Sequence, residues 1–205
     1  MVTGSKAHDA PMAPKRNTQE PDPRALFASA LATGAEVISG VSTEQLDLST
    51  PCTEFDVRTL GNHLLAAPFA VAALGRGEPY AERPEPVPFD QWRADWDASA
   101  RAARDSWADD ALLGKPISLP WDELPGAAVL AQFMGEVVVH TWDLAHATGQ
   151  WADWKPEVLE ASLRAWREGL PAEGREQYAA FGDVVAVADD APLIDRIVAW
   201  TGRRP

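Results

Sequence analysis

The chain has 205 residues, of which 46% are hydrophobic, with nine tryptophans, one cysteine and a formal net charge of −13. This length suits one domain with a small appendage, and the acidic excess argues against nucleic acid and anionic membranes as partners, because both bind clustered lysine and arginine. One cysteine excludes an intramolecular disulfide, and no apolar segment is long enough to span a bilayer, so we expect a cytoplasmic protein.

The N-terminal part predicts a tail followed by two helices. Residues 1–22 have no hydrophobic period and are expected to form a flexible tail. Apolar residues then recur at helical spacing over residues 23–40. After a loop at residues 46–55, a second helix is expected over residues 56–75, with its first aspartate as the N-cap. Pro68 inside it predicts a kink or a locally broken hydrogen-bond ladder.

The central part predicts a connector, two more helices and a β insertion. Four prolines in residues 79–88 favour an extended connector. A third helix is expected over residues 89–113, and residues 116–121 are expected to form a short strand or extended loop. The fourth helix is expected over residues 127–148, ending at Gly149. Tryptophans on one side of the third helix predict a packed bundle seam: Trp92, Trp96 and Trp107.

The C-terminal part predicts a fifth helix over residues 156–169, a short strand at residues 184–187 and a last helix capped by Asp190. The predicted fold is therefore all-α: an up-and-down four-helix bundle with a short β insertion and a small C-terminal extension. The expected domains are the tail, the bundle over residues 23–150 and an extension over residues 151–205 that packs on the bundle.

Glu136 and His140 carry the strongest chemical signal. They lie four residues apart in an apolar run, so both side chains project from one helix face. Burying such a pair is costly unless a charge neutralises it, and a divalent metal would do so. His63 lies on the apolar stripe of the second helix, is expected to point into the bundle and could supply a third ligand. The alternative is a buried Glu136–His140 ion pair with His63 hydrogen-bonded elsewhere.

Two separate segments resemble a known family. Residues 50–63, TPCTEFDVRTLGNH, resemble the second-helix motif of the DinB-like metal-binding family, and residues 136–149, EVVVHTWDLAHATG, resemble its fourth-helix motif. Residues 181–192 and 200–203 are similar to the actinobacterial branch that includes mycothiol-dependent maleylpyruvate isomerase. The resemblance covers residues 24–203.

The resemblance implies a four-helix bundle that holds a divalent metal, usually zinc, through His63, Glu136 and His140. Several family members use a low-molecular-weight thiol such as mycothiol, which implies S-transfer to, or thiol-assisted isomerisation of, a small electrophilic substrate. The alternatives are a non-enzymatic metal-dependent small-molecule binding protein, and an enzyme of specialised metabolism that uses the metal as a Lewis acid without a thiol. A monomer or homodimer is expected.

Asp143 lies one turn beyond His140 on roughly the same side of the helix. It is expected either to hydrogen-bond the His140 imidazole or serve as an outer ligand of the metal, or to pair with an arginine such as Arg58 or Arg101.

Cys52 precedes His63 by eleven residues, which predicts a position two or more helical turns from the metal and a packing role. A catalytic thiolate at a helix N-terminus is the alternative for this residue. Four further side chains are expected to have no part in the metal site: Asn62, Trp142, His146 and, in the tail, His8.

Overall fold

Seven α-helices and one two-stranded hairpin form the part of the chain that the computed structural model describes, residues 21–175, 178 and 181–205. The prediction of a mostly helical chain with a short β insertion is confirmed. Residues 1–20 of the expected tail, which include His8, lie outside the described residues. The helices and strands are α1 (Pro23–Ser39), α2 (Val57–Gly75), α3 (Trp92–Ser106), α4 (Ala111–Gly114), β1 (Pro116–Ser118), β2 (Glu123–Pro125), α5 (Gly126–Thr148), α6 (Pro156–Gly169) and α7 (Leu193–Trp200).

Local capping fixes several helix ends where the sequence predicts them. The Asp22 carboxylate accepts the backbone N–H of Arg24 at 2.9 Å at the start of α1. Asp56 Oδ1 accepts the backbone N–H of Thr59 at 2.8 Å at the start of α2. Each carboxylate thereby satisfies a donor that the first helical turn leaves unpaired. Gly149 ends α5 with a φ of 69°, in the left-handed region that favours glycine.

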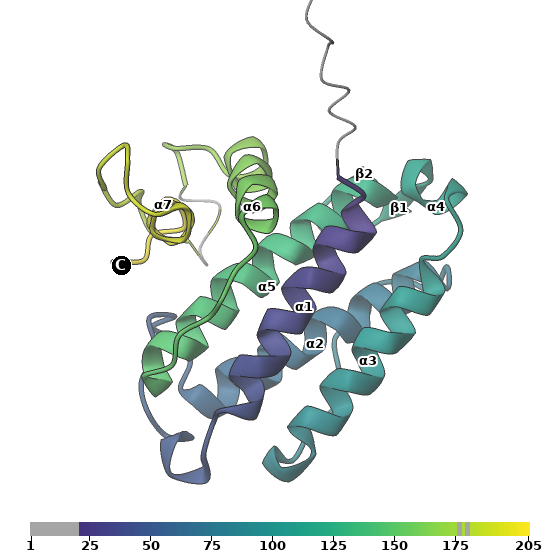
Figure 1. The fold of residues 1–205 in the computed structure, drawn as a ribbon. Helices are drawn as coiled ribbons and strands as arrows, with labels where there is room; N and C mark the ends of the chain where they lie inside the picture. Colours follow the sequence, from purple (N-terminus) through teal and green to yellow (C-terminus); the bar gives the residue numbers. More distant parts are fainter. Residues whose placement is uncertain (1–20, 176–177, 179–180) are drawn as a thin grey trace, which may run out of the picture.

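The four long helices form a bundle in which α1 and α2 each pack against α3 and α5 (Figure 1). The start of α1 lies at the end of α3, where the Arg24 guanidinium donates to the Ala108 carbonyl at 3.3 Å, so these two helices are antiparallel. The ends of α1 and α5 lie together, because the Gln150 side chain donates to the Val37 carbonyl at 3.1 Å. Helices α1 and α5 therefore run parallel.

The direction of α3 departs from the predicted up-and-down order. A Cβ on Gly61, near the start of α2, would meet the Trp92 ring at the start of α3, and one on Gly75 would meet Trp107 just past its end. Consecutive helices α2 and α3 therefore run parallel. The connector over residues 76–91 makes this possible, because about a dozen extended residues cover the roughly 28 Å length of the 19-residue α2. Short loops would have forced antiparallel neighbours.

Tryptophans hold α3 against its neighbours, as the sequence predicts. Trp92, Trp96 and Trp107 are each 1% exposed. The Trp96 indole donates to the Leu31 carbonyl in α1 at 3.1 Å, and the Trp107 indole donates to the Val71 carbonyl in α2 at 2.8 Å. Each ring thus buries a large apolar surface while its one polar group keeps a hydrogen bond.

The third helix is shorter than predicted. It ends at Ser106 rather than near Leu113, and α4 begins at Ala111 as a separate helix. Asp109 Oδ1 accepts the backbone N–H of Ala111 at 2.9 Å. The aspartate therefore starts a new turn instead of continuing the helix before it, as short polar side chains often do.

The predicted strand at residues 184–187 is wrong, since these residues have no strand beside them within the described part of the chain. The backbone N–H of Val185 instead bonds to a carbonyl of α7 at 3.0 Å. The last helix begins at Leu193 and not at Asp190, because Asp190 lies in a turn that precedes Pro192.

Helices α6 and α7 pack beside α5 on one side of the bundle (Figure 1). The approach of α6 is close enough that a Cβ on Gly135 would lie 2.9 Å from Nε1 of Trp166. No helix among the described residues is long and apolar enough to cross a membrane. The division into a bundle and an extension stays a prediction. The packing of α6 and α7 on α5 brings the last residues of the chain close to α5.

Candidate metal centre

The three predicted metal ligands come together between α2 and α5. One potential ligand atom from each of His63, Glu136 and His140 lies within 4.8 Å of the other two. Nε2 of His140 is 3.3 Å from Oε2 of Glu136, and the rings of His63 and His140 meet edge to face with centroids 4.7 Å apart. The i, i+4 spacing on α5 and the antiparallel approach of α2 produce this arrangement.

The site lies at the edge of the core rather than inside it. The His140 side chain is 9% exposed and that of Glu136 is 28% exposed, whereas His63 is exposed to solvent. The sequence predicts that His63 points into the bundle, but the side chain lies at the bundle surface and is open to solvent. Its ring packs against that of Phe55, with centroids 5.3 Å apart. A small molecule can reach such a site from solvent.

Charges around His140 control the protonation of the cluster. Burial alone would lower the pKa of His140, but hydrogen bonds to Asp143 and Glu136 raise it to about 9. Burial opposes ionisation of Glu136, yet the hydrogen bond and charge of His140 hold its pKa below the usual value. Burial and the neighbouring His140 charge lower the pKa of His63. Without a metal, the centre therefore contains a protonated His140 beside a carboxylate.

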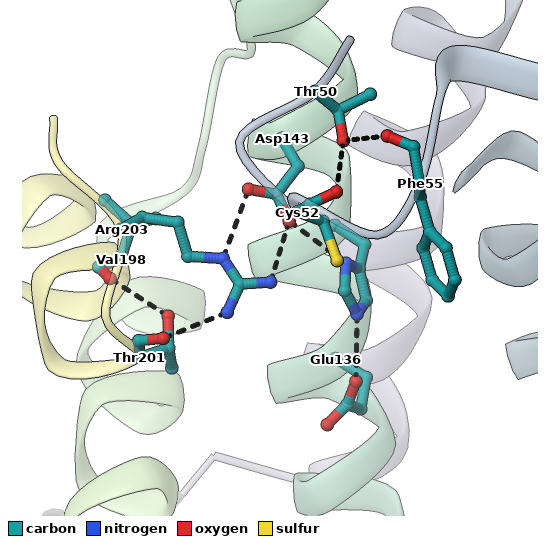
Figure 2. Close-up of polar contacts among 9 residues, drawn as sticks. Thr50, Cys52, Phe55, Glu136, Asp143, Val198, Thr201 and Arg203 are labelled. Atoms are coloured by element: carbon teal, nitrogen blue, oxygen red, sulfur yellow. Dashed lines mark hydrogen bonds and ion pairs between the residues drawn. The ribbon is translucent and has the colours of Figure 1, made fainter. Parts of the chain in front are cut away.

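Asp143 and Arg203 support His140 from the side opposite Glu136. Asp143 is fully buried, and its Oδ2 lies 3.0 Å from Nδ1 of His140. Arg203, which follows α7 and is 6% exposed, donates from Nε to Oδ1 at 3.2 Å and from Nη2 to Oδ2 at 3.0 Å (Figure 2). Its Nη1 donates to the Thr201 carbonyl at 3.0 Å. The predicted hydrogen bond between His140 and Asp143, in which the Asp143 carboxylate accepts, is confirmed. The arginine that pairs with Asp143 is Arg203, and neither Arg58 nor Arg101.

This arrangement selects one nitrogen of His140 for a metal. A carboxylate beside Nδ1 holds the proton on that nitrogen and fixes the orientation of the ring. Nε2, which faces Glu136, is then the nitrogen that can bind a cation.

Cys52 lies much closer to His140 than its distance from His63 in the sequence predicts. Its sulfur, a nitrogen of His140 and a carboxylate oxygen of Asp143 lie within 4.8 Å of one another, so the expectation of two or more helical turns is wrong. The loop before α2 folds back over α5, and Thr50 holds it (Figure 2). The Thr50 hydroxyl donates to the Phe55 carbonyl at 2.7 Å. The same hydroxyl lies 2.9 Å from the backbone carbonyl oxygen of Cys52.

Cys52, His140 and Asp143 form a second group that could hold a metal. Both oxygens of Asp143, however, already accept hydrogen bonds from Arg203, and one also bonds His140. Burial, followed by the charge of Asp143, raises the pKa of the Cys52 thiol despite the opposing charge of Arg203. A thiol binds metals as the thiolate, so the group with His63 and Glu136 is chemically the better cation site.

The remaining sequence candidates have structural contacts outside the ligand cluster. Asn62 donates to the Arg58 carbonyl at 3.1 Å and accepts the backbone N–H of Val87 at 2.6 Å. The Trp142 ring packs on the His146 ring, with centroids 4.9 Å apart, and His146 is exposed.

Arg203 is the residue of this network that sequence reasoning did not assign. A signal was present, because a buried aspartate needs a compensating cation and the resemblance extends to residues 200–203. The separation of 60 residues between Asp143 and Arg203 hid the pairing.

Comparisons with known proteins relate the chain to one family. The family model named for the mycothiol maleylpyruvate isomerase N-terminal domain matches residues 27–145, which include all three predicted ligands and end before Arg203. Two proteins of Mycobacterium tuberculosis, from strains CDC 1551 / Oshkosh and ATCC 25618 / H37Rv, are each 30% identical over 169 residues, or 82% of this chain and 91% of theirs. Both are described as uncharacterized. No solved structure matches the chain.

Proposed function

This chain belongs to the mycothiol maleylpyruvate isomerase N-terminal domain family, and from that premise we propose that it is a divalent-metal-dependent enzyme that uses a low-molecular-weight thiol. The observation that carries the proposal is the convergence of His63, Glu136 and His140 at an exposed edge of the core. Two imidazoles and a carboxylate are the three-ligand set of catalytic zinc sites, which leave one position for a substrate. Zinc is the metal we propose.

The donor set fits a cation on electrostatic grounds. A proton on Nε2 of His140, facing the Glu136 carboxylate, takes the place that a metal cation would have between the same two groups. When bound, a divalent metal lowers the pKa of a thiol ligand, and the thiolate is the nucleophile. Asp143 keeps the His140 ring oriented, and Arg203 keeps Asp143 in place.

In the proposed reaction the thiol loses its proton to solvent, and the thiolate sulfur bonds to one carbon of a double bond in a small electrophile while the π electron pair moves to the neighbouring atom. In S-transfer, that atom takes up a proton from solvent and the sulfur remains on the product. In isomerisation of an unsaturated acid, the adduct rotates about the former double bond, and expulsion of the thiolate restores that double bond. Buried Leu64 and Val137 in the adjoining core exclude water from the bundle side of the site.

The experiment is a thiol-dependent turnover assay on the zinc-loaded chain. Calorimetric titration with mycothiol tests binding, and mass spectrometry of incubations with electrophiles then tests for thioether formation or isomerised product. Thiol-dependent product supports the proposal. Binding of small molecules without chemical change would identify a metal-dependent binding protein instead, and turnover independent of any thiol would identify a Lewis-acid enzyme.

We expect metal affinity to fall as the pH falls. Metal binding needs unprotonated imidazole, and the pKa of His140 without metal is about 9. Below that pH the metal must displace one proton, so the apparent affinity should fall about tenfold per pH unit. The fall should steepen at lower pH, where His63, whose pKa is lowered, also takes up a proton. Competition with a chromophoric chelator between about pH 5 and about pH 9 measures this, and a constant affinity would contradict it.

A further inference from the structure

His63 differs from His140 in what fixes the orientation of its ring. Asp143 lies 3.0 Å from Nδ1 of His140, and a partner of this kind commonly orients a metal-bound imidazole. Neither ring nitrogen of His63 hydrogen-bonds another residue within the described part of the chain. The side chain is also exposed, so the core does not enclose it. A contact other than a hydrogen bond must therefore hold the His63 ring toward Glu136 and His140.

Phe55 supplies such a contact. Its ring centroid lies 5.3 Å from that of His63, at an interplanar angle of 47°. The rings of His63 and His140 meet edge to face, with centroids 4.7 Å apart and an interplanar angle of 88°. Both separations fall in the range in which aromatic rings attract each other. His63 therefore has two ring contacts, and one of them comes from a residue that is not a proposed ligand.

Hydrogen bonds hold Phe55 beside the helix that carries His63. The Thr50 hydroxyl donates to the Phe55 carbonyl at 2.7 Å, and the Phe55 backbone N–H donates to the Cys52 carbonyl at 2.8 Å (Figure 2). The next residue, Asp56, is the N-cap of α2. Because the backbone of Phe55 is paired on both sides and joins directly to the helix cap, its ring extends toward His63 from a fixed point.

We propose that Phe55 is a positioning residue of the metal centre, which holds the His63 ring in the orientation that binds a cation together with Glu136 and His140. The inference rests on the proposed function for the presence of a metal. An exposed side chain that is free to rotate loses that freedom when it binds, which weakens binding, whereas a ring already held in place does not. Phe55 contributes no ligand atom, so its loss should weaken metal binding without removing a ligand.

The test compares the zinc affinity of the full chain and its variants by chelator competition at one pH. Phe55→Leu keeps the apolar bulk but removes the ring, and should weaken zinc binding about tenfold, the low end of the effect of losing a group that orients a ligand. Phe55→Tyr keeps the ring, and its hydroxyl can reach solvent because Phe55 is only half-buried. This variant should stay within about twofold of wild type.

Phe89→Leu is the matched control. Phe89 is also half-buried, and its ring packs edge to face on that of Trp92, with centroids 5.0 Å apart, rather than on a proposed ligand. The same substitution at this position should leave zinc affinity unchanged. Equal losses in Phe55→Leu and Phe89→Leu would show a general effect of losing an aromatic ring and would overturn the positioning role.

Cobalt in place of zinc separates positioning from a general loss of stability. The d–d absorption of bound cobalt depends on the angles between its ligands, so Phe55→Leu should shift this absorption and Phe55→Tyr should not. An unshifted absorption in Phe55→Leu, with a lowered midpoint of urea denaturation, would assign Phe55 to folding alone and overturn the proposal.

The positioning role and the proposed function can fail separately, because zinc affinity and cobalt absorption are measured without a thiol or an electrophile. Equal zinc affinity of Phe55→Leu and wild type would overturn the positioning role and leave the proposed function standing. Weaker zinc binding by Phe55→Leu, in a chain whose wild type shows no thiol-dependent turnover, would support the positioning role and overturn the proposed function.

Discussion

Arg203→Met is expected to lower the free energy of unfolding by about 3 kcal/mol or more, because it leaves the buried Asp143 carboxylate without its main counter-charge. Asp143 is fully buried, and Arg203 contributes two of its hydrogen bonds. Removing one partner of a buried pair typically costs about 3–5 kcal/mol, since the remaining charge stays desolvated. The hydrogen bond from His140 remains in the variant, which favours the lower end of that range.

Urea denaturation of the full chain measures this effect. Arg204→Met is the matched control, because Arg204 is exposed and next in the chain, and its change should stay within about 0.5 kcal/mol. The double variant Asp143→Asn, Arg203→Met removes the unpaired charge and should recover part of the loss. Equal stability of Arg203→Met and Arg204→Met would show that the pair does not stabilise the fold.

The Arg203–Asp143 pair also connects the C-terminal segment to the proposed metal centre. Asp143 orients His140, and Arg203 reaches Asp143 only because α7 packs against α6 and α5. The helical bundle supplies all three proposed ligands, but a residue after α7 holds the carboxylate that fixes one of them. The family model that matches residues 27–145 does not include this support.

Local features of the site were predictable from the sequence because they depend on one helix at a time. The spacing of Glu136 and His140 sets their common face whatever surrounds them. Asp143 is close enough to His140 in the same helix for its hydrogen bond to be expected. Asp56 and Gly149 likewise act within a few residues of the helix ends they define.

Features that depend on how distant segments meet were not predictable in the same way. Hydrophobic periodicity does not encode the direction of α3, which the connector after α2 determines. Sequence distance from His63 gave the wrong position for Cys52, because a loop held by Thr50 folds back over α5. The same limitation applies to Arg203, whose partner lies 60 residues away.

The largest effect on metal binding is expected from Glu136→Gln, His140→Ala and His63→Ala. Loss of a residue that only orients a ligand costs about 10–100-fold in metal affinity, so loss of a ligand should cost more than about 100-fold. Glu136→Gln is the sharpest of the three, because it preserves size while removing the charge that faces Nε2 of His140. Zinc content after dialysis and chelator competition measure the loss.

Cys52→Ser separates the two possible ligand groups. If the metal is held by His63, Glu136 and His140, this variant should keep its zinc affinity within about twofold, a difference too small for a lost ligand. His146→Ala, at an exposed histidine on the same helix, is the matched control for the histidine variants and should retain full zinc.

Substitution of cobalt adds a spectroscopic readout, because a thiolate ligand produces an intense charge-transfer band that imidazole and carboxylate do not. Such a band, together with zinc loss in Cys52→Ser and retention in His63→Ala, would move the centre to Cys52, His140 and Asp143.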